Sequence, residues 1–549
     1  KQVIISKSRF GGVNARGSDL SFSKMTEVDM KGAILKYADF NSCTLTDVNM
    51  TNSNLIGADL KDAQCAGVQW EEVNLEGSDL TYANFEGANF KNAFLLEANL
   101  HGTNFTKANL SDAYLVDANL AKAIVFRKGQ TSAALVVCDL IGVATDLSKE
   151  IRRRASAKTG IPIGHIVVAA THSHTAPDYT RELWLFLGGV RENPSRSEYI
   201  EKLISAPVEA IAKAYAIAEP ATLACGTTPQ RKPVAFNRRF VMQDGSVKTW
   251  MKLDSPGVVK SAGPVDPEIG LALFRSISQD RPIGIVSNFA LHLDTVGGTK
   301  WSADYPFFIE KSLQEKMGED MISLFATGCC GDINHVDPST PQRHSADWIG
   351  AAIGDSILTG LESLTPSKDP SIFAKSLLVH LPSRDVSKEE VASSSEVVAA
   401  AKRKEKVEFL EHVDSYKNLV IDQFQRKQPF GKSTDLMTWG LSRSLAGVGP
   451  ELPVEVTVMT MGRDLAIVCL PGEVFVELGL AIKQASPFRT TLVVELSNAV
   501  ETIYIPHRAA YAGGSYEVTN SALRAGGGEI LVEAALKLLR QAAAETVAK

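Results

Sequence analysis

The stretch "ANFEGANFKNAFLLEANL", residues 83–100, repeats a pattern every five residues. Phe85 and Phe90 are five positions apart, and an alanine stands two residues before each of them. The spacing continues in both directions, so that an apolar residue occupies every fifth position from Leu20 to Leu120. A period of five fits neither the α-helix, which has 3.6 residues per turn, nor the β-strand, which has a period of two.

A short fixed period with two inward-facing positions predicts a solenoid, because each turn can bury its apolar side chains only by stacking on the next turn. The pattern resembles the pentapeptide-repeat family, whose motif is A(D/N)LXX. That resemblance implies an all-β, right-handed quadrilateral β-helix over residues 1–120. The segment has no long acidic run, so we expect a rigid spacer or a docking platform for a protein partner or another copy, not a mimic of DNA.

The period changes after residue 120. Short apolar runs such as "HIVVAA" (165–170) and "PIGIVSNFALHL" (282–293) alternate with helical patterns. This alternation predicts a larger α/β domain over residues 121–549. The stretch at about 386–428 is rich in Glu, Lys, Ala and Val, which predicts one or two inserted helices.

The composition of the chain argues against several classes of protein. The chain has 549 residues, 44% of them hydrophobic and 22% charged, with a net charge of -6, which gives no electrostatic reason to expect nucleic acid as a partner. No apolar run approaches the ~20 residues that a membrane-spanning helix needs. The seven cysteines predict no disulfide framework. The chain begins at Lys1 without a methionine, which suggests a processed product and favours a secreted or periplasmic location.

Polar side chains follow several of the apolar runs. His172 and His174 come directly after one run, and residues i and i+2 of an extended chain point to the same side. This histidine pair therefore either binds one shared ligand or consists of two hydrogen-bonded structural residues. His292 follows a second run and is another candidate ligand, and Glu473 follows a Pro-Gly turn. His335 and His507 are expected at most to support such a site.

The motifs then fall into a known order. "THSHTAP", "FNRR", "FALHLDT", "SADYP", "GCCGDIN", "LPGE" and "YIPHRAAYAGGSYE" resemble the neutral/alkaline (non-lysosomal) ceramidases, zinc amidases that release the fatty acid from N-acyl sphingosine. The resemblance extends from about Ala121 to about Ala525. It implies a zinc cofactor bound by the ligands His172, His292, Glu473 and Tyr504. It also implies three active-site groups that are not ligands: His174, Arg238 and Tyr516.

These residue types suit the chemistry. Two neutral imidazoles and a carboxylate form a common ligand set for catalytic zinc, which lowers the pKa of a bound water to about 7. His174 is expected to act as an acid/base or an oxyanion donor, Tyr516 as a hydrogen-bond donor and Arg238 as a holder of developing charge. Arg239 is expected to be solvated or structural. Asp304 and Asp332 are expected to orient ligands or to stabilise turns.

The sequence lacks the opening segment and the C-terminal β-sandwich of ceramidases, so a smaller amide or ester is also a plausible substrate. Three hypotheses follow. The first is a zinc-dependent amidohydrolase acting on ceramide or a related N-acyl lipid. The second is a zinc esterase or amidase with other substrates. The third is a catalytically inactive binding protein that uses the solenoid as its interaction platform.

Overall fold

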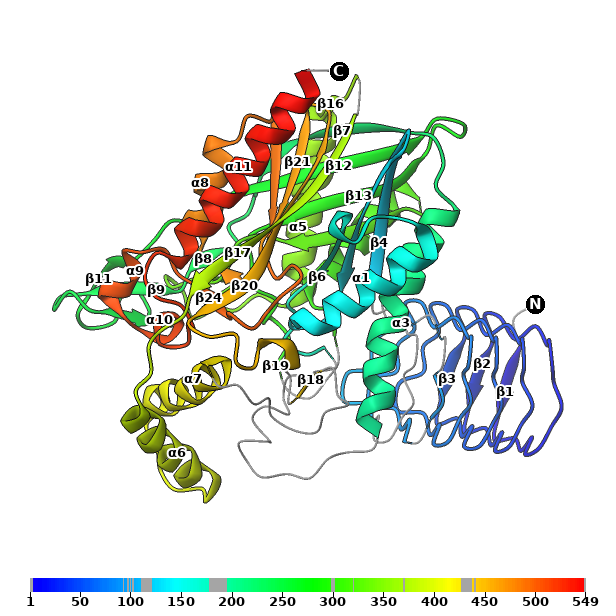
Figure 1. Cartoon of the computed structure of the whole chain (residues 1–549). Coiled ribbons are helices and arrows are strands. Elements are labelled where there is room, and N and C mark those ends of the chain that lie inside the picture. Colours follow the sequence, from blue (N-terminus) through cyan, green and yellow to red (C-terminus); the bar gives the residue numbers. More distant parts are fainter. Residues whose placement is uncertain are drawn as a thin grey trace. The chain divides into compact units, whose positions relative to one another are not determined.

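The computed structural model describes residues 3–176, 195–297, 302–425 and 437–547, apart from 92, 96–97, 99, 101–102, 110–120, 319, 369–370 and 439–440 (Figure 1). The last three expected repeat centres, Leu110, Leu115 and Leu120, and the end of the expected helical insert, 426–428, lie outside these residues. The chain divides into two compact units. The first comprises Lys1–Leu120 and Gly297–Ser302, and the second comprises Ala121–Val296 and Ala303–Lys549.

The first unit is built from coils of twenty residues. Isolated parallel bridges join residues twenty positions apart, such as Asn54 with Asn74 and Asn89 with Asn109. In the part of this unit that the structure describes, short strands pair in parallel in the order β1-β2-β3 (Figure 1). Their bounds are β1 Ile4–Ser6, β2 Lys24–Thr26 and β3 Thr44–Thr46.

Each position of the repeat has a physical role in these coils. The centre and the small residue two positions before it are buried, as Ala58 and Leu60 show. The Asp or Asn between them turns the chain, because its side chain accepts a hydrogen bond from the backbone two residues on; Lys61 N donates to Asp59 Oδ1 at 3.0 Å. The second residue after the centre has a left-handed backbone, as at Gly87 with a φ of 68°. Glycine adopts this conformation without strain.

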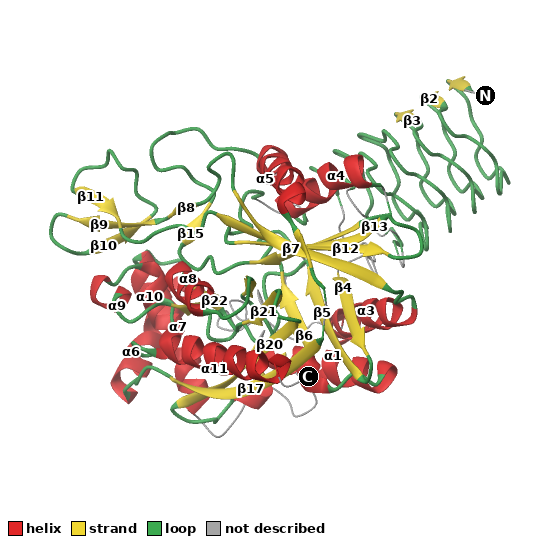
Figure 2. Cartoon of the chain, turned by 90° about the horizontal axis from the view of Figure 1, so that it is seen from above, coloured by secondary structure: helices red, strands yellow, loops and turns green. Residues whose placement is uncertain are grey.

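The second unit has two sheet layers with helices outside them. Alternation along single strands shows this directly, since β-strand side chains point to opposite faces in turn. Leu135 of β5 (Thr131–Cys138) faces the core between the layers, whereas Val136 faces helices α1 (Thr145–Thr159) and α3 (Ser195–Ala216). Val286 of β13 (Pro282–Phe289) faces the same central core, whereas Ile285 faces helices α4 (Tyr305–Met317) and α5 (Ala346–Gly360). Figure 2 shows α4 and α5 on one side of the strands and α1 on the other.

The strand order gives the layers. One layer is the sheet β14-β13-β12-β7-β16, and the other comprises the sheets β4-β5-β6 and β17-β20-β21-β23. The first layer has the bounds β7 Ala221–Pro229, β12 Glu268–Ser276, β13 Pro282–Phe289, β14 Ile322–Thr327 and β16 Thr365–Pro366. The second has the bounds β4 Ala121–Lys128, β5 Thr131–Cys138, β6 Ile166–Ala170, β17 Ile372–Pro382, β20 Glu451–Met461, β21 Leu465–Cys469 and β23 Thr490–Val494.

Small strand pairs connect the loops at one end of the layers. They are β8 Phe236–Asn237 with β15 Ile333–Asn334, β22 Glu473–Val474 with β24 Tyr504–Ile505, β18 Met437–Thr438 with β19 Leu441–Ser442, and the sheet of β9 Arg239–Met242, β10 Val247–Thr249 and β11 Val258–Ser261. The pairs β8/β15 and β22/β24 join segments that are far apart in sequence, and β22/β24 places Glu473 beside Tyr504.

The outer helices cover the sheets. Their bounds are α1 Thr145–Thr159, α3 Ser195–Ala216, α4 Tyr305–Met317, α5 Ala346–Gly360, α6 Lys388–Lys402, α7 Phe409–Gln425, α8 Val476–Ala485, α9 Ala510–Gly513, α10 Tyr516–Thr519 and α11 Gly527–Val547. Within the described ranges, 3₁₀ turns occur at η1 Ile163–His165, η2 Leu361–Ser363 and η3 Arg443–Leu445. Among the described residues, no helix is both long enough and apolar enough to cross a membrane.

Candidate metal centre

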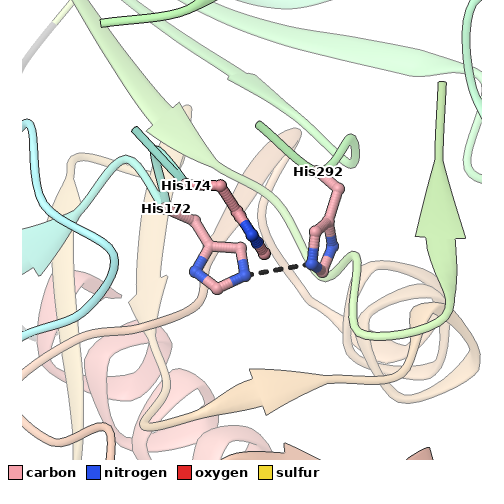
Figure 3. Close-up of side chains that lie close together, drawn as sticks. All are labelled: His172, His174 and His292. Atoms are coloured by element: carbon pink, nitrogen blue, oxygen red, sulfur yellow. Dashed lines mark hydrogen bonds between the residues drawn. The ribbon is translucent and has the colours of Figure 1, made fainter. Parts of the chain in front are cut away.

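His172 and His174 lie at the carboxyl end of the fully buried strand β6. The loop that carries them runs parallel to the segment after β13, because Ser173 bridges to Leu293 and His174 N donates to Leu293 O at 3.0 Å. This pairing brings His292 beside the other two histidines (Figure 3). His172 has a left-handed backbone with a φ of 73°, a strained conformation for a residue with a side chain.

The hydrogen bonds of the two buried histidines fix their tautomers. His172 Nδ1 donates to Ile141 O at 2.6 Å, and His292 Nδ1 donates to Cys330 O at 3.1 Å. A neutral imidazole that carries its proton on Nδ1 has a lone pair on Nε2. These two Nε2 atoms face each other at 3.0 Å (Figure 3). Two lone pairs at this distance repel each other unless a proton or a metal ion lies between them.

Glu473 adds a negative charge to this arrangement. Its Oε2 atom lies 3.4 Å from His172 Nε2 and 3.7 Å from His292 Nε2. This buried oxygen accepts no hydrogen bond within the described part of the chain. Burial opposes the charged form of Glu473, but His172, His292 and Arg238 outweigh it and lower the pKa of the carboxyl to about 2. Glu473 is therefore ionised at neutral pH.

The spacing of these three atoms suits one metal ion. A tetrahedral zinc ion with bonds of about 2.0–2.1 Å separates its ligand atoms by about 3.3 Å. The three separations of 3.0, 3.4 and 3.7 Å lie around that value. Two imidazoles and a carboxylate are also donors that zinc prefers. The residues present therefore fit a divalent cation.

His174 completes the histidine cluster. Its ring centroid lies 4.9 Å from that of His172 and 5.3 Å from that of His292. Ring nitrogens of all three histidines lie within 4.8 Å of one another. Unlike the other two, His174 has an exposed side chain, so it reaches solvent from the edge of the cluster.

Tyr504 lies next to Glu473 because β22 and β24 pair in parallel with these two residues in register. Its hydroxyl accepts a hydrogen bond from Arg238 Nη2 at 3.0 Å. Burial, and then the charge of Glu473, raise the pKa of Tyr504 well above its ordinary value. Tyr516 packs against it with ring centroids 5.6 Å apart. The structure thus brings all seven sequence-predicted site residues into one region.

Arg238 is a buried cation whose position is fixed on several sides. Its Nε donates to Glu517 Oε1 at 2.8 Å, and its Nη2 also donates to Gly331 O at 2.8 Å. Gly331 packs closely on Glu473, since a Cβ atom at Gly331 would lie 2.6 Å from the carbonyl oxygen of Glu473. The loop "GCCGDIN" therefore needs a glycine at 331, where its backbone contacts both Arg238 and the strand that carries Glu473.

Sequence reasoning missed Glu495, which supports two of the candidate ligands. Its Oε2 accepts hydrogen bonds from Cys330 N at 3.1 Å and from Val474 N at 2.7 Å. Cys330 carries the carbonyl that orients His292, and Val474 follows Glu473 in the chain. Burial raises the pKa of Glu495 to about 8. The available signal was a glutamate ending the apolar run "TTLVVE".

The two aspartates that the sequence predicts to orient ligands or to stabilise turns have different hydrogen-bond partners. Asp332 accepts from Val476 N at 2.9 Å and from Asn237 Nδ2 at 2.7 Å. Asp304 caps α4 by accepting from the backbone of Tyr305.

The two outlying histidines lie beside carboxylates, and the second arginine is buried. His335 Nδ1 lies 2.8 Å from Asp294 Oδ1, and His507 Nε2 lies 3.4 Å from Glu477 Oε1. Arg239 is buried, not solvated, and its Nη2 donates to Gly514 O at 2.8 Å, so its role is structural.

The two parts of the chain are similar to different known proteins. Residues 23–62, 58–95 and 83–121 match the family model described as pentapeptide repeats. A pentapeptide repeat protein from the cyanobacterium Cyanothece matches 20% of this chain and 84% of that chain, with 21% identity and a TM-score of 0.14. No curated protein gives a significant match.

The larger part is similar to solved ceramidases. A neutral ceramidase from Pseudomonas aeruginosa has 16% sequence identity and a TM-score of 0.53, over 77% of this chain and 69% of that chain. A ceramidase complexed with C2 has the same identity and TM-score, over 77% of this chain and 70% of that chain. The chain therefore carries pentapeptide repeats followed by an α/β domain with the neutral ceramidase fold. The resemblance predicted from the motifs is confirmed at the level of the fold.

Proposed function

We propose that residues 121–549 form a zinc-dependent hydrolase domain that cleaves the amide bond of ceramide or a related N-acyl lipid. The observation that carries this proposal is the pair of facing Nε2 atoms of His172 and His292, 3.0 Å apart beside the ionised Glu473. The fold that the domain shares with neutral ceramidases supports the substrate class.

His172, His292 and Glu473 would hold the ion, with Tyr504 as a fourth ligand. When bound, zinc supplies Lewis acidity and lowers the pKa of a water molecule to about 7. Tyr504 would have to lose or share its proton to act as a ligand, and its hydroxyl already accepts a hydrogen bond from the Arg238 guanidinium. That positive charge favours the deprotonated phenol.

His174 is suited to move a proton. Hydrolysis of an amide adds water across the C–N bond, so the proton that the water loses must reach the leaving nitrogen. The His174 ring is exposed at the edge of the cluster and lies beside both buried histidines. It would accept the proton during attack and donate it to the departing amine.

Arg238 and Tyr516 would stabilise negative charge as it develops on the substrate oxygen. Arg238 is held rigidly by Glu517 and Gly331, so its charge needs little reorganisation during the reaction. Tyr516 packs against Tyr504 and can donate a hydrogen bond from its hydroxyl.

The test uses the purified full chain and three substrate types: a long-chain ceramide, a short-chain acyl amide and an aryl ester. We expect about one zinc ion per chain, hydrolysis of the N-acyl lipid, loss of activity with a chelator and recovery when zinc is added back. Cleavage of the ester or short amide alone would replace the lipid substrate with a smaller one. A zinc-loaded chain that cleaves none of the three would contradict the proposal.

We also propose that residues 1–120 form a separate domain, a right-handed quadrilateral β-helix that acts as a rigid spacer or docking platform. The pairing of residues twenty positions apart supports this, because four repeats of five residues then complete one coil. Light scattering of the full chain tests whether its partner is a second copy. A monomer at all concentrations would exclude that partner.

A further inference from the structure

Two aromatic side chains from separate parts of the chain gather beside Tyr516. The ring centroid of Trp250, which follows β10, lies 4.8 Å from that of Tyr516. The ring of Phe409, the first residue of α7, stacks on Tyr516 with centroids 5.8 Å apart and an interplanar angle of 20°. Trp250 and Phe409 lie 6.3 Å from each other. Because Tyr516 also contacts Tyr504, ring contacts run without a break to the candidate metal centre.

The outer two rings are exposed. Trp250 and Phe409 each retain 53% exposure, although large aromatic residues stabilise a fold mainly when they are buried. Neighbouring exposed apolar side chains commonly mark a binding surface. Leu253 and Leu410, which are close to them in sequence, are also exposed, at 45% and 37%.

The backbone of Trp250 is held in an unfavourable conformation. Its φ is 63°, in the left-handed region that a bulky residue rarely occupies. Its N–H donates to Arg238 O at 2.8 Å, so the same residue that binds Tyr504 also holds Trp250 in place. Such strain persists where the surroundings impose it, commonly at functional sites.

We propose that Trp250 and Phe409 form a binding subsite for the aliphatic chain of the substrate. The assignment of that chain to a substrate rests on the proposed function. Apolar rings offer contact area to methylene groups, and the path of rings ends where Arg238 and Tyr516 would meet the polar group of the same molecule. The buried Arg238 guanidinium disfavours a cationic occupant at this end of the path.

Binding of unreactive chains tests the subsite without any turnover. Isothermal titration calorimetry would compare butyrate, octanoate and laurate, each below its micelle concentration. In the wild-type chain the affinity should rise with chain length, by up to about fourfold for each methylene that gains contact. Trp250→Ala and Phe409→Ala should each weaken laurate binding about tenfold more than butyrate binding.

Ile322→Ala is the matched control. Ile322 is an exposed apolar residue at the start of β14, and Thr327 at the other end of that strand donates to Thr171 O beside His172. At about 3.3 Å per residue, Ile322 lies about 17 Å further along the strand. This variant should bind laurate as the wild type does. Equal affinity for all three acids in the wild type, or wild-type laurate binding in both aromatic variants, would overturn the subsite.

Turnover separates this inference from the proposed function. With acetyl, octanoyl and palmitoyl amides of one amine, Phe409→Ala should lower kcat/KM for the palmitoyl amide about tenfold more than for the acetyl amide and leave the zinc content unchanged. Chain-length-dependent binding without hydrolysis would keep the subsite and remove the hydrolase. Hydrolysis without chain-length dependence in either assay would keep the hydrolase and remove the subsite.

Discussion

At the scale of single residues, the candidate site depends on three atoms that cannot be stable together without a positive charge. The Nε2 atoms of His172 and His292 and the Oε2 atom of Glu473 are buried and turned toward one another. A buried polar atom without a partner costs about 1–3 kcal/mol. A shared proton or a metal ion would remove that cost, and zinc content distinguishes the two.

Removing a ligand should remove the metal. Glu473→Ala leaves two imidazoles without the carboxylate, so we expect zinc affinity to fall by more than the ten- to hundredfold that is typical when only a supporting residue is lost. His172→Ala should do the same. The measurement is zinc content after equilibration with a competing chelator. Wild-type occupancy in either variant would disprove the ligand assignment.

Groups that act on the substrate should behave in the opposite way. His174→Ala should keep its zinc and lose about 10²–10⁴ in kcat, the usual contribution of a proton-transfer group. Tyr516→Phe keeps the ring and loses the hydroxyl, so kcat should fall by about 10²–10³. Steady-state kinetics on zinc-saturated protein checks both. Unchanged rates would exclude these residues from the mechanism, and loss of zinc from His174→Ala would make it a ligand.

Glu495 is a positioning residue, because it contacts neither Nε2 atom and acts through Cys330 and Val474. Glu495→Ala should weaken zinc binding about ten- to hundredfold. Glu495→Gln keeps a hydrogen-bond acceptor and should recover much of that loss. A chelator competition series measures both variants. Identical zinc affinity in Glu495→Ala and the wild type would show that the two backbone contacts do not orient the ligands.

The sequence predicts some of these residues better than others. His172 and His174 stand out because two histidines one residue apart follow a buried strand. Glu473 and Tyr504 are far less evident in isolation, since each is an ordinary residue after a turn, and only the ordered motifs singled them out. Glu495 could not be chosen, because its role depends on a loop that lies 165 residues away in sequence. The ligand and catalytic roles themselves stay predictions.

At the scale of elements, a period of five residues predicts the repeats without any tertiary information, because every coil uses the same two inward positions. The α/β class of the rest is also evident from alternating apolar runs and helical patterns. The face-to-face packing of two sheet layers is not evident from the sequence. An apolar run such as β5 indicates that both faces of the strand are buried, but it does not indicate which elements cover them. The layers depend on contacts between strands far apart in sequence.

The repeat core should respond strongly to loss of a large side chain. Phe85 is fully buried and packs edge-to-face on Trp70, with centroids 5.2 Å apart. Phe85→Ala should destabilise the first unit by about 3–5 kcal/mol. Phe22→Ala is the control, because Phe22 is 60% exposed and its loss should cost below about 1 kcal/mol. Chemical denaturation measures both, and equal stabilities would contradict the packing.

At the scale of the whole molecule, the two units differ in how far apart in sequence their contacting residues lie. Each coil of the first unit pairs residues twenty positions apart, whereas the candidate centre of the second joins His172, His292 and Glu473, which lie far apart along the chain. A site assembled in this way requires the second unit to be folded. Zinc should therefore bind to the native second unit and raise its resistance to unfolding.

Anomalous X-ray scattering at the zinc edge, from crystals of the full chain grown with zinc, tests the central claim most directly. The account requires a peak about 2.0–2.2 Å from His172 Nε2, His292 Nε2 and a carboxylate oxygen of Glu473. A peak coordinated by other residues, or no peak between these three side chains in zinc-saturated crystals, would contradict it.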